Sequence, residues 1–430
     1  MKLNYKRTFF IGFAFMSISA FWQLYDNIIP LILKNTFGLG ETITGGIMAI
    51  DNVLAIFLLP IFGALSDRVS TRVGKRTPFI IFGTIIAVIF MILIPIADQS
   101  GNFILFFVAL GVALIAMGSY RSPAVALMPD LTPKELRSKG NAVINLMGAV
   151  GGIFTLAMIS LLIPKTANPN YLGVFLVVAL FMVISIVVLI ATIKENKLSK
   201  QIKKDTENSE QQREQENKIK NSESEEMPKD VKKSLYFILA SIFLWFTAYN
   251  AVTTAFSRYA TEVWKLQGGS FANALMVAMG AAIVSFIPVG IISSIIGRKK
   301  TIIIGISLIS ISYFCGFLFV NYSPLINIVF AVTGIGWASI NVNSYPMVVE
   351  MSRSFDVGKY TGIYYTFSMA AQIFTPVFSG FLMESVSYRI LFPYAVIFSL
   401  LSLCTMIFVK HGDSKPPKKG SKLENFDVED

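Results

Sequence analysis

Twelve apolar segments constrain the fold of this chain more than any other feature of its sequence. Each segment is long enough to cross about 30 Å of hydrocarbon at about 1.5 Å per helical residue. The segments span residues 8–33, 44–65, 79–97, 103–128, 140–163, 171–193, 235–257, 272–295, 301–320, 325–348, 359–383 and 388–410. Inside lipid a backbone must satisfy its own hydrogen bonds, so all twelve are predicted to be helices. The expected fold class is an all-α integral membrane protein.

The composition excludes several classes of protein. Hydrophobic residues make up 54% of the chain and charged residues only 15%, whereas an ordinary soluble domain is about 25% charged. A soluble enzyme, a nucleic-acid-binding protein and a disordered chain are therefore excluded. Cys315, Cys404 and the one histidine, His411, offer neither metal-ligand spacing nor a nucleophile with its base. We expect no enzymatic activity, cofactor or metal site.

The basic residues predict the orientation in the membrane. If both termini lie on one side, 31 of the 37 Lys and Arg residues fall on that side, and Arg121 lies inside a segment. The loops on the other side carry five: Lys34, Lys165, Arg258, Lys265 and Arg389. Such a bias places both termini in the cytoplasm and supports an even number of crossings of the cell membrane. Residues 1–10 are expected to be a short basic lead into the first segment and not a cleavable signal peptide.

A polar segment divides the chain into two parts with six apolar segments each. Residues 194–233 carry 11 basic and 10 acidic side chains, a mixture that cannot bury a core. We therefore expect residues 194–234 to be a mobile cytoplasmic linker, with a regulatory docking site as the alternative. The expected organisation is an N-terminal half over 1–193, this linker, a C-terminal half over 235–411 and a cytoplasmic tail over 412–430.

A weak internal repeat relates the two halves. Gly63, Gly74 and Asp130 recur as Gly290, Gly297 and Glu350, at offsets of 227, 223 and 220 residues. Two parallel six-helix repeats are the architecture of major-facilitator transporters, in which the substrate site lies near the membrane midplane between the halves. The repeat therefore predicts a cavity between two pseudo-symmetric halves.

The most specific motif joins the second and third apolar segments. It begins at Gly63, which permits close helix contact, and continues through an acid at a helix end into a basic loop. We expect this loop to act in gating on the cytoplasmic side. The predicted gating residues are Gly63, Asp67, Arg68, Arg72, Gly74, Lys75 and Arg76.

This loop resembles the major-facilitator signature, with four extra residues between Asp67-Arg68 and Gly74-Lys75-Arg76. The longer form is similar to that of the sucrose–proton symporters and the wider glycoside–pentoside–hexuronide cation symporters. Further similar stretches lie at 51–52, 120–131, 249–251, 341–346 and 358–365. The resemblance implies a secondary transporter that imports a sugar or glycoside by cation symport.

Two departures from the family pattern bear on the coupling ion and on the sugar site. Where the melibiose-type sodium symporters carry two carboxylates one helical turn apart, this chain has Ala55 and Leu59, which favours a proton over sodium. The plant sucrose carriers place an arginine where this chain has Val125. Arg121 lies one turn earlier on the same helix face and is inferred to take that role.

Three ionisable residues are expected deep in the membrane: Asp26, Asp51 and Arg121. Such residues are costly in lipid and usually face a cavity or a partner. Asp26 and Asp51 are each expected about 10 Å from the outer membrane surface and are the predicted cation-coupling residues. The alternative is a structural ion pair.

Polar and aromatic side chains share helix faces in the expected first, seventh, tenth and eleventh spans, a pattern that suits a sugar. The predicted substrate-binding residues are Arg121, Gln23, Asp26, Asn250, Tyr249, Trp337, Asn341, Tyr365 and Gln372. Packing or interface positions are the alternative for each aromatic residue.

Two alternative functions stay open. Gly148, Gly151 and Gly152 provide the paired glycines of exporters without their proline, so a carrier of a drug, a lysolipid or another amphipathic solute is the first alternative. A transport-like membrane sensor would need a folded output domain, for which the chain has only the polar linker. We expect a monomer in the lipid bilayer whose partners are a small molecule and a coupling proton.

Overall fold

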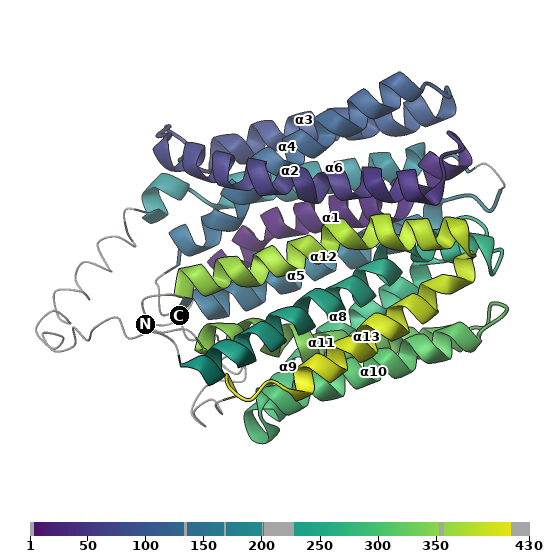
Figure 1. Ribbon diagram of the computed structural model, residues 1–430. Coiled ribbons are helices and arrows are strands. Elements are labelled where there is room, and N and C mark those ends of the chain that lie inside the picture. The colour runs from purple at the N-terminus through teal and green to yellow at the C-terminus, as the bar shows by residue number, and fades with distance from the viewer. Residues whose placement is uncertain are drawn as a thin grey trace, which may run out of the picture.

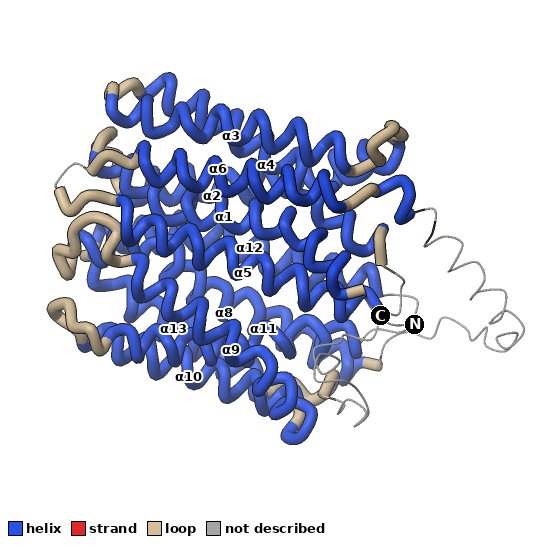
Figure 2. The backbone as a smooth tube through the Cα atoms, turned by 180° about the vertical axis from the view of Figure 1, so that it is seen from behind, coloured by secondary structure: helices blue, strands red, loops and turns tan. Residues whose placement is uncertain are grey.

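The computed structural model describes residues 4–132, 136–166, 169–199, 201, 228–351 and 357–413. Within these residues, twelve helices are long and apolar enough to cross a membrane, and they lie side by side in one bundle (Figure 1). The described residues form helices and loops, with no strand among them (Figure 2). The predicted all-α membrane fold is confirmed.

The helices match the expected spans closely. The first half contains α1 (Tyr5–Asn35), α2 (Glu41–Arg68), α3 (Thr77–Gln99), α4 (Phe103–Asp130), α5 (Arg137–Leu162) and α6 (Leu172–Thr192). The second contains α8 (Lys229–Glu262), α9 (Ala272–Ile296), α10 (Arg298–Leu318), α11 (Ile326–Glu350), α12 (Val357–Ser385), the short 3-10 helix η2 (Tyr388–Ile390) and α13 (Leu391–Ile407).

Helix α8 differs most from its expected span of 235–257. It begins at Lys229 and ends at Glu262, and its last turns are buried within the protein over residues 257–260. Arg258, which the charge distribution assigned to an outer loop, is therefore a helical residue. Lys200 and residues 202–227 of the expected linker, and 414–430 of the expected tail, lie outside the described residues.

The same neighbour relations recur in both halves. Helix α1 packs on α5 and α6 and α3 packs on α4, just as α8 packs on α12 and α13 and α10 packs on α11. Across the junction α2 packs on α12, and its symmetry counterpart α9 packs on α5. The predicted arrangement of two six-helix pseudo-repeats is thus confirmed, with a pseudo-twofold relation between the halves.

The two ends of the bundle differ in how the halves meet. We call the end at which α1 begins and α13 ends the terminal end, and the opposite end the distal end (Figure 1). The backbones of α2 and α12 come together toward the distal end, where a Cβ on Gly45 would overlap the carbonyl of Pro376. On the same helix pair, Gly380 lies against the carbonyl of Glu41. Small residues at such crossings permit close contact between membrane helices.

Candidate functional site

A cavity of about 190 Å³ lies between the two halves, lined by residues of α1, α5, α8, α9, α10 and α11. Four predicted substrate residues line it: Gln23, Asp26, Tyr249 and Trp337. The rings of Tyr249 and Trp337 stack with their centroids 3.8 Å apart and their planes 6° apart. A mostly apolar cavity with a few polar groups is typical of a small-molecule site.

The structure brings the three predicted membrane charges together. Asp26 on α1, Asp51 on α2 and Arg121 on α4 lie close enough for their charges to interact. Asp51 accepts a hydrogen bond of 2.8 Å from the side chain of Asn52. The Arg121 guanidinium lies 5.5 Å from the centroid of the Trp22 ring, and no ion pair joins it to either acid within the described residues.

The three charges do not face the same space. Asp26 lines the central cavity. Asp51 and Arg121 line a second, much smaller cavity inside the first half, together with Trp22. Trp22 directly precedes Gln23, which lines the central cavity, so α1 separates the two spaces. Asp26 is therefore positioned to contact a solute, whereas Asp51 and Arg121 can influence the cavity through their charge.

Besides Arg121, four more predicted substrate residues do not line the central cavity. Asn341 is exposed one helical turn beyond Trp337 toward the terminal end, and the Tyr365 side chain is 54% exposed. The amide nitrogen of Asn250 is buried without a partner among the described residues. The amide of Gln372 donates to the carbonyl of Ser368 at 3.3 Å. Tyr365 nevertheless interacts electrostatically with Arg121, across the junction between the halves.

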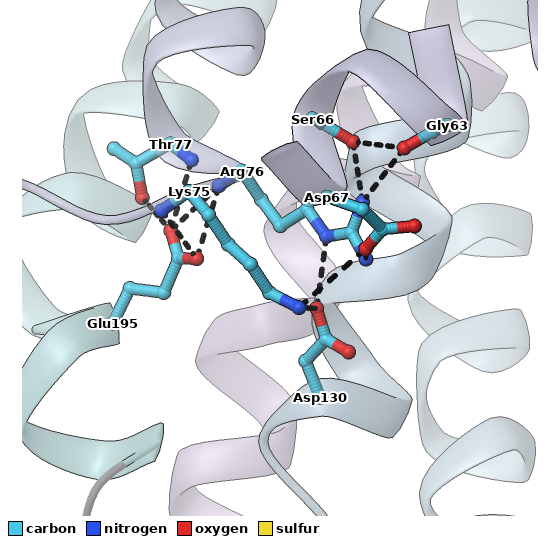
Figure 3. A network of polar contacts seen from close by, with 8 residues as sticks. All are labelled: Gly63, Ser66, Asp67, Lys75, Arg76, Thr77, Asp130 and Glu195. Atoms are coloured by element: carbon cyan, nitrogen blue, oxygen red, sulfur yellow. Dashed lines mark hydrogen bonds and ion pairs between the residues drawn. The ribbon is translucent and has the colours of Figure 1, made fainter. Parts of the chain in front are cut away.

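The predicted gating loop forms a polar network at the terminal end of the first half (Figure 3). Arg76 at its centre donates from Nε to the Asp130 carboxylate at 2.8 Å and from Nη2 to Asp67. Its Nη1 also donates to the Gly63 carbonyl at 3.3 Å. The network therefore connects the ends of α2, α3 and α4.

Lys75 supports the same acids, whereas two predicted gating residues do not take part. The Lys75 amine lies 3.1 Å from Asp130 and 3.6 Å from Asp67. Arg68 and Arg72 are exposed, and the described residues give neither of them an ion pair with Asp67. Of the three loop arginines, Arg76 is the one that pairs with Asp67 within the described residues, because it reaches back from the start of α3 while Arg68 and Arg72 are exposed.

Glu195 completes this end of the first half and was not recognised in the sequence. Its carboxylate accepts from the backbone N–H groups of Lys75, Arg76 and Thr77 at 2.9, 3.0 and 2.9 Å. It thereby satisfies the free donors at the start of α3. Gly74 has a φ of 137°, and a Cβ there would overlap this carboxylate. Glu195 is only 2% exposed. The sequence after residue 193 is polar throughout, so its composition did not distinguish Glu195 as a buried residue.

The second half repeats this arrangement. Arg298 at the start of α10 pairs with Glu350 at the end of α11, as Arg76 pairs with Asp130. Asp413 accepts a hydrogen bond of 2.9 Å from the backbone N–H of Lys299. Lys299 lies two residues after Gly297, whose φ is 97°. The internal repeat of Gly74 and Gly297 therefore marks a pair of equivalent helix caps.

A buried charge cluster joins the halves at the distal end, and none of its residues was predicted from the sequence to form a site. Glu41 at the start of α2 pairs with Arg258 of α8 at 2.9 Å, and the two side chains are 4% and 1% exposed. Lys34 of α1 pairs with Glu262 at 2.5 Å, and Tyr388 donates to Glu41. The sequence does show opposite charges near the ends of these spans, which could have indicated ion pairs. Which of them pair depends on how the two halves meet.

The described residues contain no group of three or more His, Cys, Asp or Glu side chains that could hold a metal ion.

Comparisons with known proteins agree with this architecture. The sequence profile of the Major Facilitator Superfamily matches residues 11–294 and 268–428. The chain is 23% identical over 151 residues to the sucrose transport protein SUC3 of Arabidopsis thaliana, covering 31% of this chain and 25% of that protein. It is 27% identical over 188 residues to the proton-associated sugar transporter A of Homo sapiens, covering 40% of this chain and 25% of that protein. The chain thus spans a quarter of the length of these relatives.

A solved structure shows the same fold over nearly the whole chain. The inward-open xylose transporter XylE of E. coli superposes with a TM-score of 0.66 at 14% identity, covering 98% of both chains. The profile match, the twelve paired helices and the repeated terminal caps together establish that this chain belongs to the Major Facilitator Superfamily and resembles its sucrose–proton symporter branch.

Proposed function

We propose that this protein imports a sugar or glycoside across the cell membrane by proton symport. The central cavity carries the proposal, because the Asp26 carboxylate and the stacked rings of Tyr249 and Trp337 line it together. The proton affinity of a carboxyl group depends on its burial, so an acid that alternates between water and an enclosed site can couple proton movement to transport. The names of the aligned sugar transporters support this substrate class.

The packing of the two halves supports an inward-facing state of the transport cycle for this structure. The distribution of the basic residues supports a cytoplasmic position for the terminal end and for both chain termini. The buried cluster of Glu41 and Arg258 then closes the outer end. Outward opening would separate this cluster and bring the halves together at the terminal end.

The proposed roles follow the positions of the residues. Asp26 binds the coupling proton beside the solute, and Asp51 with Arg121 sets the charge around it. Gln23, Tyr249 and Trp337 contact the solute, while Asn341 and Tyr365 would meet it on its way to the cytoplasm. The Asp67–Arg76–Asp130 network of the gating loop holds one end of the first half rigid as it moves.

Transport by purified protein in proteoliposomes tests the proposal. An inward proton gradient should drive accumulation of a radiolabelled sugar above equilibrium, and a protonophore should abolish it. Accumulation that follows a sodium gradient instead would contradict proton coupling. Failure to transport any mono- or disaccharide would contradict the sugar substrate.

A second candidate is a carrier of another amphipathic solute, favoured by the apolar α9 side of the cavity. Proton-driven efflux of an amphipathic dye from the same proteoliposomes, without sugar uptake, would establish this function in place of the first.

A further inference from the structure

The α9 side of the central cavity is apolar along its whole length. Six residues of α9 at helical spacing line the cavity: Leu275, Ala278, Met279, Ala282, Ile283 and Phe286. Positions three or four apart share one face of a helix, so these side chains form a continuous stripe about 16 Å long. No side chain in this α9 stripe carries an N–H or O–H group.

The polar groups of the cavity lie on other helices. Gln23 and Asp26 come from α1, and Tyr249 and Thr253 come from α8. Tyr313 of α10, which was not among the predicted substrate residues, also lines the cavity. Its hydroxyl is buried and has no hydrogen-bond partner among the described residues. A buried hydroxyl normally has a partner, so a hydroxyl-bearing ligand would complete this site.

This division of the cavity discriminates between solutes. A sugar hydroxyl placed against the α9 stripe would lose its hydrogen bonds to water without replacement. An apolar group placed there would gain free energy for every methylene-sized area removed from water. Met279 lies in the middle of the stripe, and its flexible side chain can adapt to apolar groups of different shape.

We infer that the preferred substrate is an amphipathic glycoside, whose sugar contacts α1, α8 and Tyr313 and whose apolar aglycone lies against the α9 stripe. This inference rests on the proposed transport of a sugar or glycoside and narrows its substrate class. A fully hydroxylated disaccharide fits this cavity less well, because one of its two rings would face the stripe.

Equilibrium binding to the full-length protein in lipid nanodiscs tests the inference with matched ligands. The probes are the methyl and phenyl α- and β-glycosides of glucose and galactose, the disaccharides sucrose, lactose and melibiose, and phenol alone. At least one phenyl glycoside should bind at least tenfold more tightly than its methyl counterpart, than any of the disaccharides and than phenol.

Each other outcome overturns a defined part of the argument. A methyl glycoside or a disaccharide that binds as tightly as the best phenyl glycoside overturns the amphipathic preference and leaves sugar transport standing. Phenol that binds as tightly as the phenyl glycosides overturns recognition of the sugar. Absence of binding by every member of the panel overturns the inference together with the proposed function.

Variants of α9 locate the aglycone. Phe286→Ala should reduce the preference for the phenyl over the methyl glycoside from at least tenfold to below threefold. The matched control is Ile287→Ala, on the neighbouring position of the same helix, which is 44% exposed and does not line the cavity. If Phe286→Ala does not fold, Ile283→Thr keeps the branched shape, adds a hydroxyl and should narrow the same preference. An unchanged preference in the folded variant would place the aglycone elsewhere.

Discussion

At the residue scale, the two buried acids of the first half have different surroundings although their charges interact. Asp26 lines the central cavity, whereas Asp51 shares a small cavity with Arg121 and accepts from Asn52. A solute in the central cavity can therefore contact the Asp26 carboxylate directly, whereas Asp51 can act on it only through long-range electrostatics. The two acids should contribute differently to binding and to coupling.

Neutralising each acid separates these contributions. Asp26→Asn and Asp51→Asn should both lower proton-driven accumulation by at least tenfold, because the group that takes up the proton, or its electrostatic partner, is lost. Exchange of labelled for unlabelled sugar, which needs no net proton movement, should persist in both variants. Only Asp26→Asn should also change sugar affinity, since only Asp26 lines the cavity.

The control for these variants is Asp230→Asn, which removes an exposed acid at the start of α8. It should accumulate sugar as the wild type does. Normal uphill accumulation in both Asp26→Asn and Asp51→Asn would remove these residues from the coupling mechanism.

At the element scale, the ends of helices carry the groups that hold each half and each state together. Arg76 connects α2, α3 and α4 inside the first half, whereas Glu41 and Arg258 connect the two halves. In the proposed transport cycle, the first set would move with its half as one body. The second set would have to separate whenever the distal end opens.

Asp67→Asn tests the polar network at the terminal end of the first half. The variant keeps the shape of the side chain but loses a charge-assisted contact with Arg76, worth about 1 kcal/mol at a partly exposed site, or about fivefold in an equilibrium. Turnover should fall several-fold with a smaller effect on sugar affinity. Arg72→Gln is the control, because Arg72 is exposed outside the network. Equal turnover in Asp67→Asn and wild type would show that the loop has no part in gating and only sets the orientation of the chain in the membrane.

Glu41→Gln tests the distal cluster. It leaves the buried Arg258 without its acid, which costs about 3 kcal/mol or more in the closed state. The equilibrium should shift toward the outward-open state, so a cysteine at Thr253 in the cavity should react faster with an impermeant maleimide added outside. Cys315 and Cys404 are first replaced by serine to remove the native thiols.

A second substitution distinguishes the lost pair from general damage. Glu41→Gln combined with Arg258→Gln removes both charges and should return the labelling rate toward that of the wild type. Lys265→Gln, on a side chain that is 77% exposed near the same cluster, should leave the rate unchanged. External labelling that does not respond to Glu41→Gln would show that the cluster does not lock the outer end.

At the scale of the whole molecule, the two halves are joined by a segment whose beginning has a structural role. Deletion of residues 204–225, which are rich in both charge signs, should leave transport within about twofold of wild type, because a segment of this composition cannot bury a core and the entropic cost of a connection depends only weakly on its length. Glu195→Gln, in contrast, weakens the cap of α3 and should lower thermal stability. Transport lost on deletion with normal membrane insertion would indicate a docking role for the segment.

The sequence by itself determined the twelve helices, their division into two halves and the resemblance to sugar symporters. Lipid offers no hydrogen-bond partners, so a long apolar segment has one stable backbone conformation, and its neighbours need not be known. The sequence also revealed the repeat of Gly74 and Gly297, because a positive φ depends on local backbone geometry. It indicated that Asp26 lies within the membrane, because depth depends only on the position of a residue along its helix.

Only the tertiary structure decided which side chains meet. It placed Asn341, Tyr365 and Gln372 outside the central cavity and brought Tyr313 into its lining. It also buried Glu195 and Arg258, which the sequence assigned to a polar linker and an outer loop. Membrane helices are apolar toward lipid and toward each other alike, so hydropathy does not reveal which face of a helix packs on which neighbour. The partners of these residues depend on how helices distant in sequence meet.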